Sequence, residues 1–130
     1  MKIKAIFKVA IIIIAIFLIV SVGGIFYITR GLGEGSETKL NGIDLSALED
    51  GTYQGTYNNG RWTNQLEITV KEHEITNIRI KEDVTFAMQG VSEELFQKVM
   101  QAQNTTVDAV SQATITSKAY LKSIENALNQ

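Results

Sequence analysis

An uncharged apolar run near the start of the chain constrains this sequence most. From Val9 to Ile28 the chain carries no charged side chain and consists mainly of Ile, Val, Phe and Ala. As a helix at about 1.5 Å per residue, such a run is roughly 30 Å long, the thickness of a bilayer's hydrocarbon core. A helix that is apolar on all sides does not suit the surface of a soluble domain. The run therefore predicts one membrane-spanning helix.

A cleavable signal peptide is the alternative interpretation of the same run. The small residues of Ser21-Val22-Gly23 are of the kind that a signal peptidase accepts. However, the run is longer than the usual signal core of about 7–15 residues. Tyr27 suits the membrane interface, and a lipid-modified cysteine anchor is excluded because the chain has no cysteine. We therefore expect an uncleaved membrane anchor over residues 1–30.

The charges around the run predict its orientation. Because Lys2, Lys4 and Lys8 precede it, the positive-inside rule places the N-terminus in the cytoplasm and the following domain outside. Of the chain's 12 Lys and Arg, these three and Arg30 lie in the first 30 residues, which leaves eight against all 14 acids. Such an acidic domain repels a phosphate backbone, so no nucleic-acid partner is expected. The predicted location is the cell membrane, single-pass, with an extracytoplasmic domain.

The rest of the chain divides into a spacer and a folded domain. Residues 31–49 begin with Gly-Leu-Gly-Glu-Gly-Ser-Glu-Thr, a composition typical of a flexible linker. Residues 50–130 carry the regular patterns. Strand formers fill 52–57, apolar and polar residues alternate over 66–70, and a third strand is predicted at 75–80. These segments predict an antiparallel meander.

Turn residues separate the predicted strands. Asn59-Gly60 is a favoured pair for a hairpin turn. His73 lies between two glutamates in the second turn, and no second His or Cys exists to complete a metal site with it. We therefore expect His73 to be a turn residue, and no metal site is predicted.

Two helices are expected to pack on this sheet. The first is expected to run from Ser92, as N-cap, to Gln103. The side chains on its buried face are expected to be Leu95, Phe96, Val99 and Met100. The second has its apolar face at Tyr120, Leu121, Ile124, Ala127 and Leu128, and we expect it to begin near Thr116 or Ser117 with a hydroxyl N-cap. The predicted fold class is α+β: a small antiparallel meander packed by two helices, preceded by one N-terminal transmembrane helix.

The stretch before the last helix is rich in hydroxyls. Asp108 and the hydroxyls of Ser111, Thr114, Thr116 and Ser117 lie within a few residues of each other. A helix start presents unpaired amides and partial positive charge, a combination that binds phosphate. The plainer interpretation is that these hydroxyls cap the helix and fill a turn.

Residues 108–114, Asp-Ala-Val-Ser-Gln-Ala-Thr, resemble a known flavinylation motif, Asp-x-x-(Ser/Thr)-Gly-Ala-(Thr/Ser). This is the motif of the FMN-binding domain family, which includes the small subunits of the sodium-translocating quinone reductase and of the Rnf-type electron-transport complex. The Asp-Gly-Thr-Tyr at residues 50–53 and the Ile-Thr-Asn-Ile at 75–78 also resemble this family. The resemblance covers roughly residues 50–130, and its specific part is the C-terminal motif.

The resemblance implies a covalent cofactor and assigns roles to the motif residues. In this family a separate flavin transferase joins FMN through its phosphate to the last Thr or Ser, which here is Thr114; Thr116 is the alternative acceptor. Asp108 is implied in recognition by the transferase. The further residues implied in binding FMN are Ser111, Gln112, Ala113, Thr116 and Ser117.

Two positions depart from the family pattern. Gln112 stands where the motif has Gly, a residue that serves a positive φ or a close backbone approach. His73 stands where the turn often has Gly, and His visits left-handed φ more readily than most residues.

Three apolar residues have two interpretations each. Phe86 and Met88 either pack in the core or lie against a flavin ring, and we expect the core because a small domain needs its apolar residues for packing. Trp62 either stacks on the flavin or anchors the hairpin.

The sequence therefore predicts a membrane-anchored extracytoplasmic electron-transfer module that carries covalent FMN. Its partners would be the transferase, a membrane redox donor, and an external or neighbouring acceptor. A redox carrier or accessory subunit is expected rather than a stand-alone enzyme, and no catalytic residue is assigned, because no nucleophile–base pair is visible. The alternatives are a non-covalent FMN-binding or sensing domain and a cofactor-free interaction domain.

Overall fold

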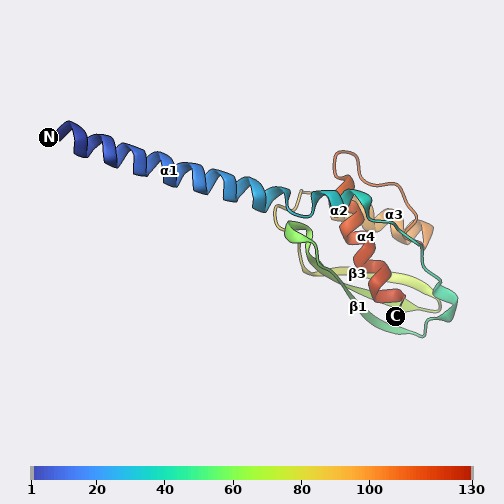
Figure 1. The fold of residues 1–130 in the computed structure, drawn as a ribbon. Coiled ribbons are helices and arrows are strands. Elements are labelled where there is room, and N and C mark those ends of the chain that lie inside the picture. Colours follow the sequence, from blue (N-terminus) through green and yellow to red (C-terminus); the bar gives the residue numbers. More distant parts are fainter. Residues whose placement is uncertain (1, 130) are drawn as a thin grey trace. The chain divides into compact units, whose positions relative to one another are not determined.

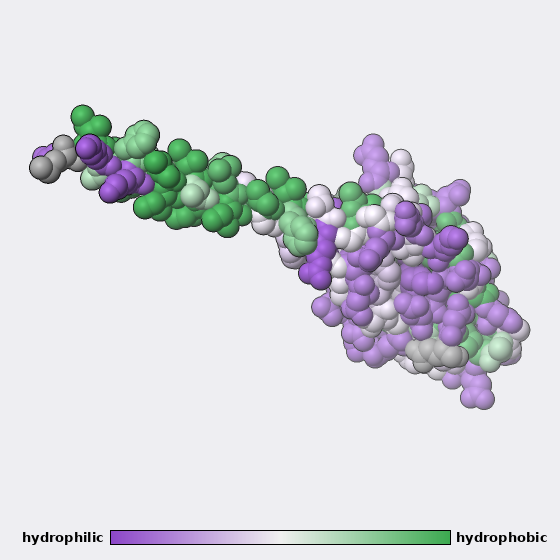
Figure 2. All heavy atoms as spheres, viewed as in Figure 1, coloured by the Kyte–Doolittle hydropathy of each residue, from purple (hydrophilic) through white to green (hydrophobic). Residues whose placement is uncertain are grey.

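The computed structural model describes residues 2–129 and divides into two compact units, one ending at Arg30 and the other beginning at Gly31. The first is a single helix, α1 (Lys2–Thr29), with no buried residue. It is long and apolar enough to cross a membrane, and Figure 2 shows its surface as largely hydrophobic, with hydrophilic side chains near the N-terminal end. These properties fit a membrane anchor and also a signal sequence.

The second unit contains a three-stranded antiparallel sheet, which confirms the predicted meander (Figure 1). Its strands are β1 (Gly51–Tyr57), β2 (Asn64–Lys71) and β3 (Glu74–Glu82), in the order β1-β2-β3. The alternation in β2 has the expected effect, because Leu66, Ile68 and Val70 are buried while the intervening residues are partly exposed. The sheet therefore has one apolar face.

The connections between the strands differ in kind. The turn between β2 and β3 is tight, and His73 adopts a left-handed φ of 62°, as the sequence predicts for a residue in the place of a glycine. Its Nδ1 lies 3.1 Å from the Leu45 carbonyl oxygen. The connection between β1 and β2 is longer than a two-residue hairpin, because residues 60–62 form the 3₁₀ turn η2 (Gly60–Trp62).

The first helix after the sheet is α3 (Val91–Ala102). Of the expected stripe, Leu95, Phe96 and Val99 are buried, and Met100 is partly buried against the core. Ser92 is not its N-cap: the cap is Gly90, whose φ of 80° is a left-handed conformation that costs glycine little.

Helix α4 (Thr114–Leu128) begins before the predicted start, with Ala113 as an N-cap that makes no side-chain bond. It crosses one face of the sheet (Figure 1). The approach to β1 is so close that a Cβ at Gly55 would lie 1.9 Å from the Ser123 carbonyl oxygen. Gly55 is therefore the residue that lets α4 lie on the sheet.

Residues 31–49, which we call the strap, differ from the predicted flexible spacer. They form α2 (Leu32–Glu37) and the 3₁₀ turn η1 (Leu45–Ala47), and they belong to the same compact unit as the sheet. Gly35 is buried so close to α4 that a Cβ there would lie 2.6 Å from the Ile115 Cγ2. Leu45 joins the hydrophobic core. The strap is ordered because it packs against residues that are distant in the sequence. Composition does not reveal such contacts.

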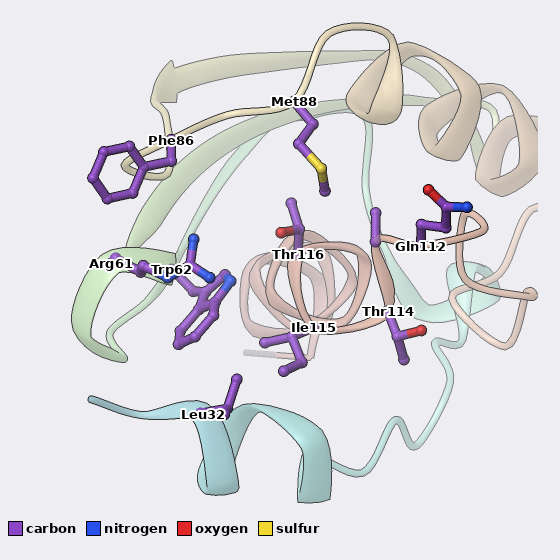
Figure 3. A pocket seen from close by; sticks show the side chains of 10 residues that line it. Leu32, Arg61, Trp62, Phe86, Met88, Gln112, Thr114, Ile115 and Thr116 are labelled. Atoms are coloured by element: carbon purple, nitrogen blue, oxygen red, sulfur yellow. The ribbon is translucent and has the colours of Figure 1, made fainter. Parts of the chain in front are cut away.

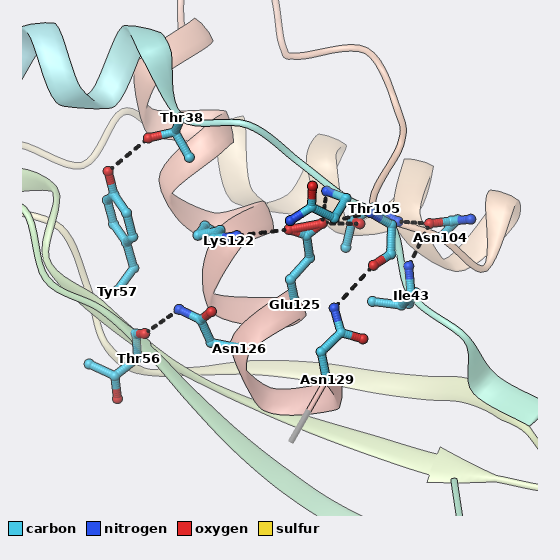
Figure 4. A network of polar contacts seen from close by, with 12 residues as sticks. Thr38, Ile43, Thr56, Tyr57, Asn104, Thr105, Lys122, Glu125, Asn126 and Asn129 are labelled. Carbon is cyan, nitrogen blue, oxygen red and sulfur yellow. Dashed lines mark hydrogen bonds and ion pairs between the residues drawn. The ribbon is translucent and has the colours of Figure 1, made fainter. Parts of the chain in front are cut away.

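A buried carboxylate fastens the strap to α4 (Figure 4). Glu125 is 1% exposed. Its Oε1 accepts hydrogen bonds from the Asn41 amide at 2.5 Å, the Gly42 amide at 2.7 Å and the Thr105 hydroxyl at 3.2 Å. Its Oε2 lies 3.5 Å from the Lys122 Nζ. A buried carboxylate is costly unless its oxygens have partners. The Asn41 and Gly42 amides of the strap supply two of these partners, so the bonds to Glu125 hold the strap against α4.

Candidate functional site

The second unit has a cavity of about 590 Å³ beside the start of α4. Small-molecule sites commonly measure about 300–1,000 Å³. Four segments far apart in the sequence line it: Leu32 of α2, Arg61 and Trp62 of η2, Phe86 and Met88 of the loop after β3, and residues 112–116. Figure 3 shows Arg61, Trp62 and Phe86 at one side and Thr114 and Gln112 at the other. The cavity is therefore made by tertiary folding around the hydroxyl-rich motif.

Four of the predicted site residues line this cavity: Gln112, Ala113, Thr114 and Thr116. Thr114 is exposed, whereas Thr116 is 7% exposed. Thr114 is also the first residue of α4, and the first hydrogen bond of the helix joins the Ser117 amide to the Ala113 carbonyl at 2.8 Å. The amides of residues 114–116 therefore precede the helical ladder and point toward the preceding loop. This geometry suits an anion beside the Thr114 hydroxyl.

Gln112 adopts a left-handed conformation with a φ of 65°. For a residue other than glycine this conformation costs roughly 1–2 kcal/mol. The resembled motif has Gly at this position, and glycine adopts this left-handed conformation without strain. Gln112 retains the loop shape at a cost in strain.

The side chain of Ser117 has a hydrogen-bond partner within the chain. Its side chain is fully buried, and its Oγ accepts a hydrogen bond from the Val110 amide at 3.0 Å. It does not line the cavity, and neither does Ser111. Ser117 therefore braces the loop that carries the motif.

Asp108 lies outside this cavity as well. It is exposed and borders a second hollow of about 550 Å³ with neighbours that include Lys98 and Thr106. The Lys98 Nζ donates to the backbone carbonyl of Asp108 at 3.5 Å. The Asp108 side chain is therefore accessible from solvent.

Phe86 and Met88 correct the sequence prediction, because they are not core residues. They are 62% and 44% exposed, and Leu32 is 44% exposed. Within residues 31–129, these three are the exposed large hydrophobic side chains, and all three line the cavity. Exposed apolar side chains gathered at one hollow indicate a binding surface. Trp62, by contrast, is 2% exposed and forms part of the cavity wall.

Sequence reasoning missed Arg61 and Leu32 as site residues. The Arg61 guanidinium carbon lies 4.1 Å from the centroid of the Trp62 ring and 5.9 Å from that of Phe86. Within the described part of the chain, Arg61 is the one charged residue among those that line the cavity. The adjacent pair Arg61-Trp62 was the only available signal, since Leu32 lies in a segment with the composition of a linker.

Comparison with known proteins gives a family for this arrangement. Residues 60–129 match the FMN-binding domain family. No curated protein and no solved structure matches the chain. The matched range contains η2, β2, β3, α3, α4 and every residue that lines the cavity except Leu32. Because this range is more than half of the chain, the protein belongs to the FMN-binding domain family.

Proposed function

We propose that this protein is a membrane-anchored, extracytoplasmic electron-transfer module that carries FMN linked through its phosphate to Thr114. The observation that carries the proposal is the position of Thr114. Its exposed side chain lies at the cavity, on the first residue of α4, in a flavinylation-like motif of an FMN-binding domain. Thr116 is a weaker candidate because it is buried, and a transferase must reach its acceptor.

The residues at the cavity suit both ends of FMN. The first amides of α4, beside Thr114, suit a phosphate. Exposed Phe86, Met88 and Leu32, with the wall provided by Trp62, suit a flat apolar ring system. The donor set therefore fits this cofactor, with the phosphate at the motif and the ring among the apolar side chains.

The bound FMN would supply the capacity to accept and release electrons. The chain's residues bind and orient it. Thr114 holds the phosphate by a covalent bond, and the amides of 114–116 stabilise its negative charge. Phe86, Met88 and Leu32 exclude water from part of the ring. Since they leave the cavity open to solvent on one side, another carrier can approach.

Attachment exchanges one bond for another at phosphorus. The Thr114 oxygen would form a bond to the phosphorus of an activated flavin nucleotide, the phosphorus–oxygen bond to that nucleotide's leaving group would break, and the hydroxyl proton would pass to a base of the transferase. A separate flavin transferase would catalyse this step, and the accessible Asp108 would contribute to its recognition. A covalent bond prevents loss of FMN outside the cell, where diffusion would dilute a loosely bound cofactor.

The charges near the N-terminus support the orientation. Lys2, Lys4 and Lys8 precede the apolar part of α1, so the N-terminus would stay in the cytoplasm and the second unit outside. The anchor would hold the flavin near a membrane redox donor, from which electrons pass to an external or neighbouring acceptor.

The test is the intact mass of the full-length protein in detergent, produced with and without an exported flavin transferase. Thr114→Ala and Thr116→Ala run alongside it. We expect the mass of one phosphate-linked FMN in wild type and Thr116→Ala, and none in Thr114→Ala. The same spectrum reports whether residues 1–30 are retained.

An unmodified mass beside a transferase that modifies a known substrate would overturn covalent attachment. Titration with free FMN then separates the alternatives. The chain has one tryptophan, Trp62, and it lines the cavity, so FMN binding would quench its fluorescence. Quenching would indicate a non-covalent FMN domain, and unchanged fluorescence would indicate a cofactor-free interaction domain.

A further inference from the structure

The guanidinium of Arg61 lies among the rings at one side of the cavity. It is 4.1 Å from the Trp62 ring centroid and 5.9 Å from that of Phe86. Figure 3 shows this group across the cavity from Thr114. With the phosphate on Thr114, the ring system of the flavin would be the part that lies toward Arg61.

The backbone around Arg61 holds this cation in position. The Arg61 carbonyl accepts a hydrogen bond from the Thr85 amide at 2.8 Å, which ties η2 to the residue before Phe86. The Trp62 amide donates to the Asn59 carbonyl at 3.0 Å, and the Trp62 ring is 2% exposed. The guanidinium therefore lies on a fixed aromatic surface, a favourable place for a cation.

Arg61 is a positive charge in an acidic domain. Residues after Arg30 hold eight basic side chains against 14 acids, and Arg61 is the charged residue among the described residues that line the cavity. Charges interact more strongly beside low-dielectric walls than in water. Its charge therefore lies beside whatever occupies the cavity.

Reduction changes the charge of a flavin ring. At pH 8 the ring takes up two electrons and one proton from a reductant, which leaves it with one additional negative charge. A nearby cation stabilises that charge and so favours the reduced form. A cation that contacted only the phosphate would have no such preference, since the phosphate charge does not change.

We propose that Arg61 raises the reduction potential of the bound flavin by placing a positive charge at the ring end of the cavity. This inference rests on the proposed function. It adds a role that the motif does not contain, because Arg61 comes from η2 and not from the segment before α4.

The test compares Arg61→Gln, Arg61→Lys and Arg79→Gln in the full-length flavinylated protein in detergent. Arg79→Gln is the matched control: it removes the same charge from the sheet, where Arg79 pairs with Glu67 at 3.0 Å, and Arg79 does not line the cavity. The midpoint potential of the attached flavin is measured at pH 8 by dithionite titration against reference dyes. Intact mass confirms that each variant carries FMN.

We expect Arg61→Gln to disfavour reduction at least tenfold, which is about 30 mV lower for a two-electron couple. Arg61→Lys would recover part of this shift, and Arg79→Gln would leave the potential unchanged. Equal potentials in wild type and Arg61→Gln would overturn the inference and leave the proposed function intact. A lower flavin content with an unchanged potential would also overturn it, since Arg61 would then contact the phosphate. If wild type carries no FMN by mass and binds none by Trp62 fluorescence, the proposed function itself fails.

Discussion

The hydroxyl of Ser117 accepts a hydrogen bond from the amide of Val110, with 3.0 Å between the two heavy atoms. The bond spans the loop in which Gln112 takes its left-handed conformation, and both partners are buried. It therefore fixes the shape of the segment that presents Thr114. Ser117 does not line the cavity, and its contribution in this structure is to hold the loop beside it.

Replacing Ser117 with Ala is expected to lower the free energy of unfolding by about 1–3 kcal/mol, because the buried Val110 amide loses its acceptor. Ser111→Ala is the control, since Ser111 is exposed and a surface change usually has an effect within about 0.5 kcal/mol. Urea denaturation measures both. Equal stabilities of the two variants would show that the bond to Val110 is dispensable.

Gln112→Gly is expected to stabilise the protein relative to Gln112→Ala by about 1 kcal/mol, because Ala keeps the left-handed strain and Gly does not. Ser111→Gly is the control at a position without a positive φ. A glycine there only adds freedom to the unfolded chain, so this variant should be destabilised. Urea midpoints measure stability, and the rate of mass gain measures flavin attachment. An Ala variant as stable as the Gly variant would contradict the argument.

Gly55→Ala is expected to cost at least about 3 kcal/mol, beyond the usual range for overpacking. The new Cβ would lie 1.9 Å from the Ser123 carbonyl oxygen and 2.6 Å from the Ala127 amide nitrogen, so backbone must move. Gly51→Ala, in the same strand, has no atom within 4 Å of the added Cβ and should be nearly neutral. Thermal unfolding by circular dichroism distinguishes them, and similar melting temperatures would refute the close approach.

Glu125→Ala is expected to release the strap and to cost about 3 kcal/mol, because the Asn41 and Gly42 amides lose a buried acceptor. Lys39 in the strap gives a local readout, since trypsin should cleave after it faster once the strap detaches. Glu125→Gln keeps an acceptor oxygen and should show a smaller change. The exposed Glu34→Ala is the control. Unchanged cleavage after Lys39 in Glu125→Ala would mean that other contacts hold the strap.

The free energy of unfolding is expected to fall at high pH because Tyr120 then loses its proton. Its burial, the hydrogen bond from its hydroxyl to Asp83 and the negative charge of Asp83 raise its pKa well above the ordinary value of about 10. A raised folded-state pKa gives a stabilisation that is complete below pH of about 10 and is lost as the pH rises further. In an alkaline titration of tyrosinate absorbance, Tyr120→Phe should lack the late step that Tyr53→Phe keeps. Matching curves for the two variants would contradict this assignment.

The parts of the fold that follow from local patterns could be predicted from the sequence. Alternation in residues 66–70 and the spacing of Leu95, Phe96 and Val99 depend on the period of a strand or a helix, and both predicted faces are buried. The turn at His73 was also predictable from local sequence, because a left-handed backbone conformation restricts the residue types that fit.

The parts that depend on distant partners could not be predicted in this way. The acceptor for the Asn41 amide lies 84 residues along the chain, at Glu125. The start of α4 was misplaced because a hydroxyl N-cap was expected, whereas the cap is Ala113 and the Ser117 hydroxyl bonds to the Val110 amide instead. Phe86 was assigned to the core because a binding surface and a core use the same apolar residues.

The strap also determines where this domain can be cut. The family match begins at residue 60 and the strand pattern near residue 50, but a fragment that starts at either point lacks Leu32 and leaves Glu125 buried without the amides of residues 41 and 42. For expression without the membrane helix, the cut belongs before Gly31. The boundary of a sequence family marks the segment that its members share. Here the smallest fragment that folds is expected to be larger than that segment, because it includes the strap.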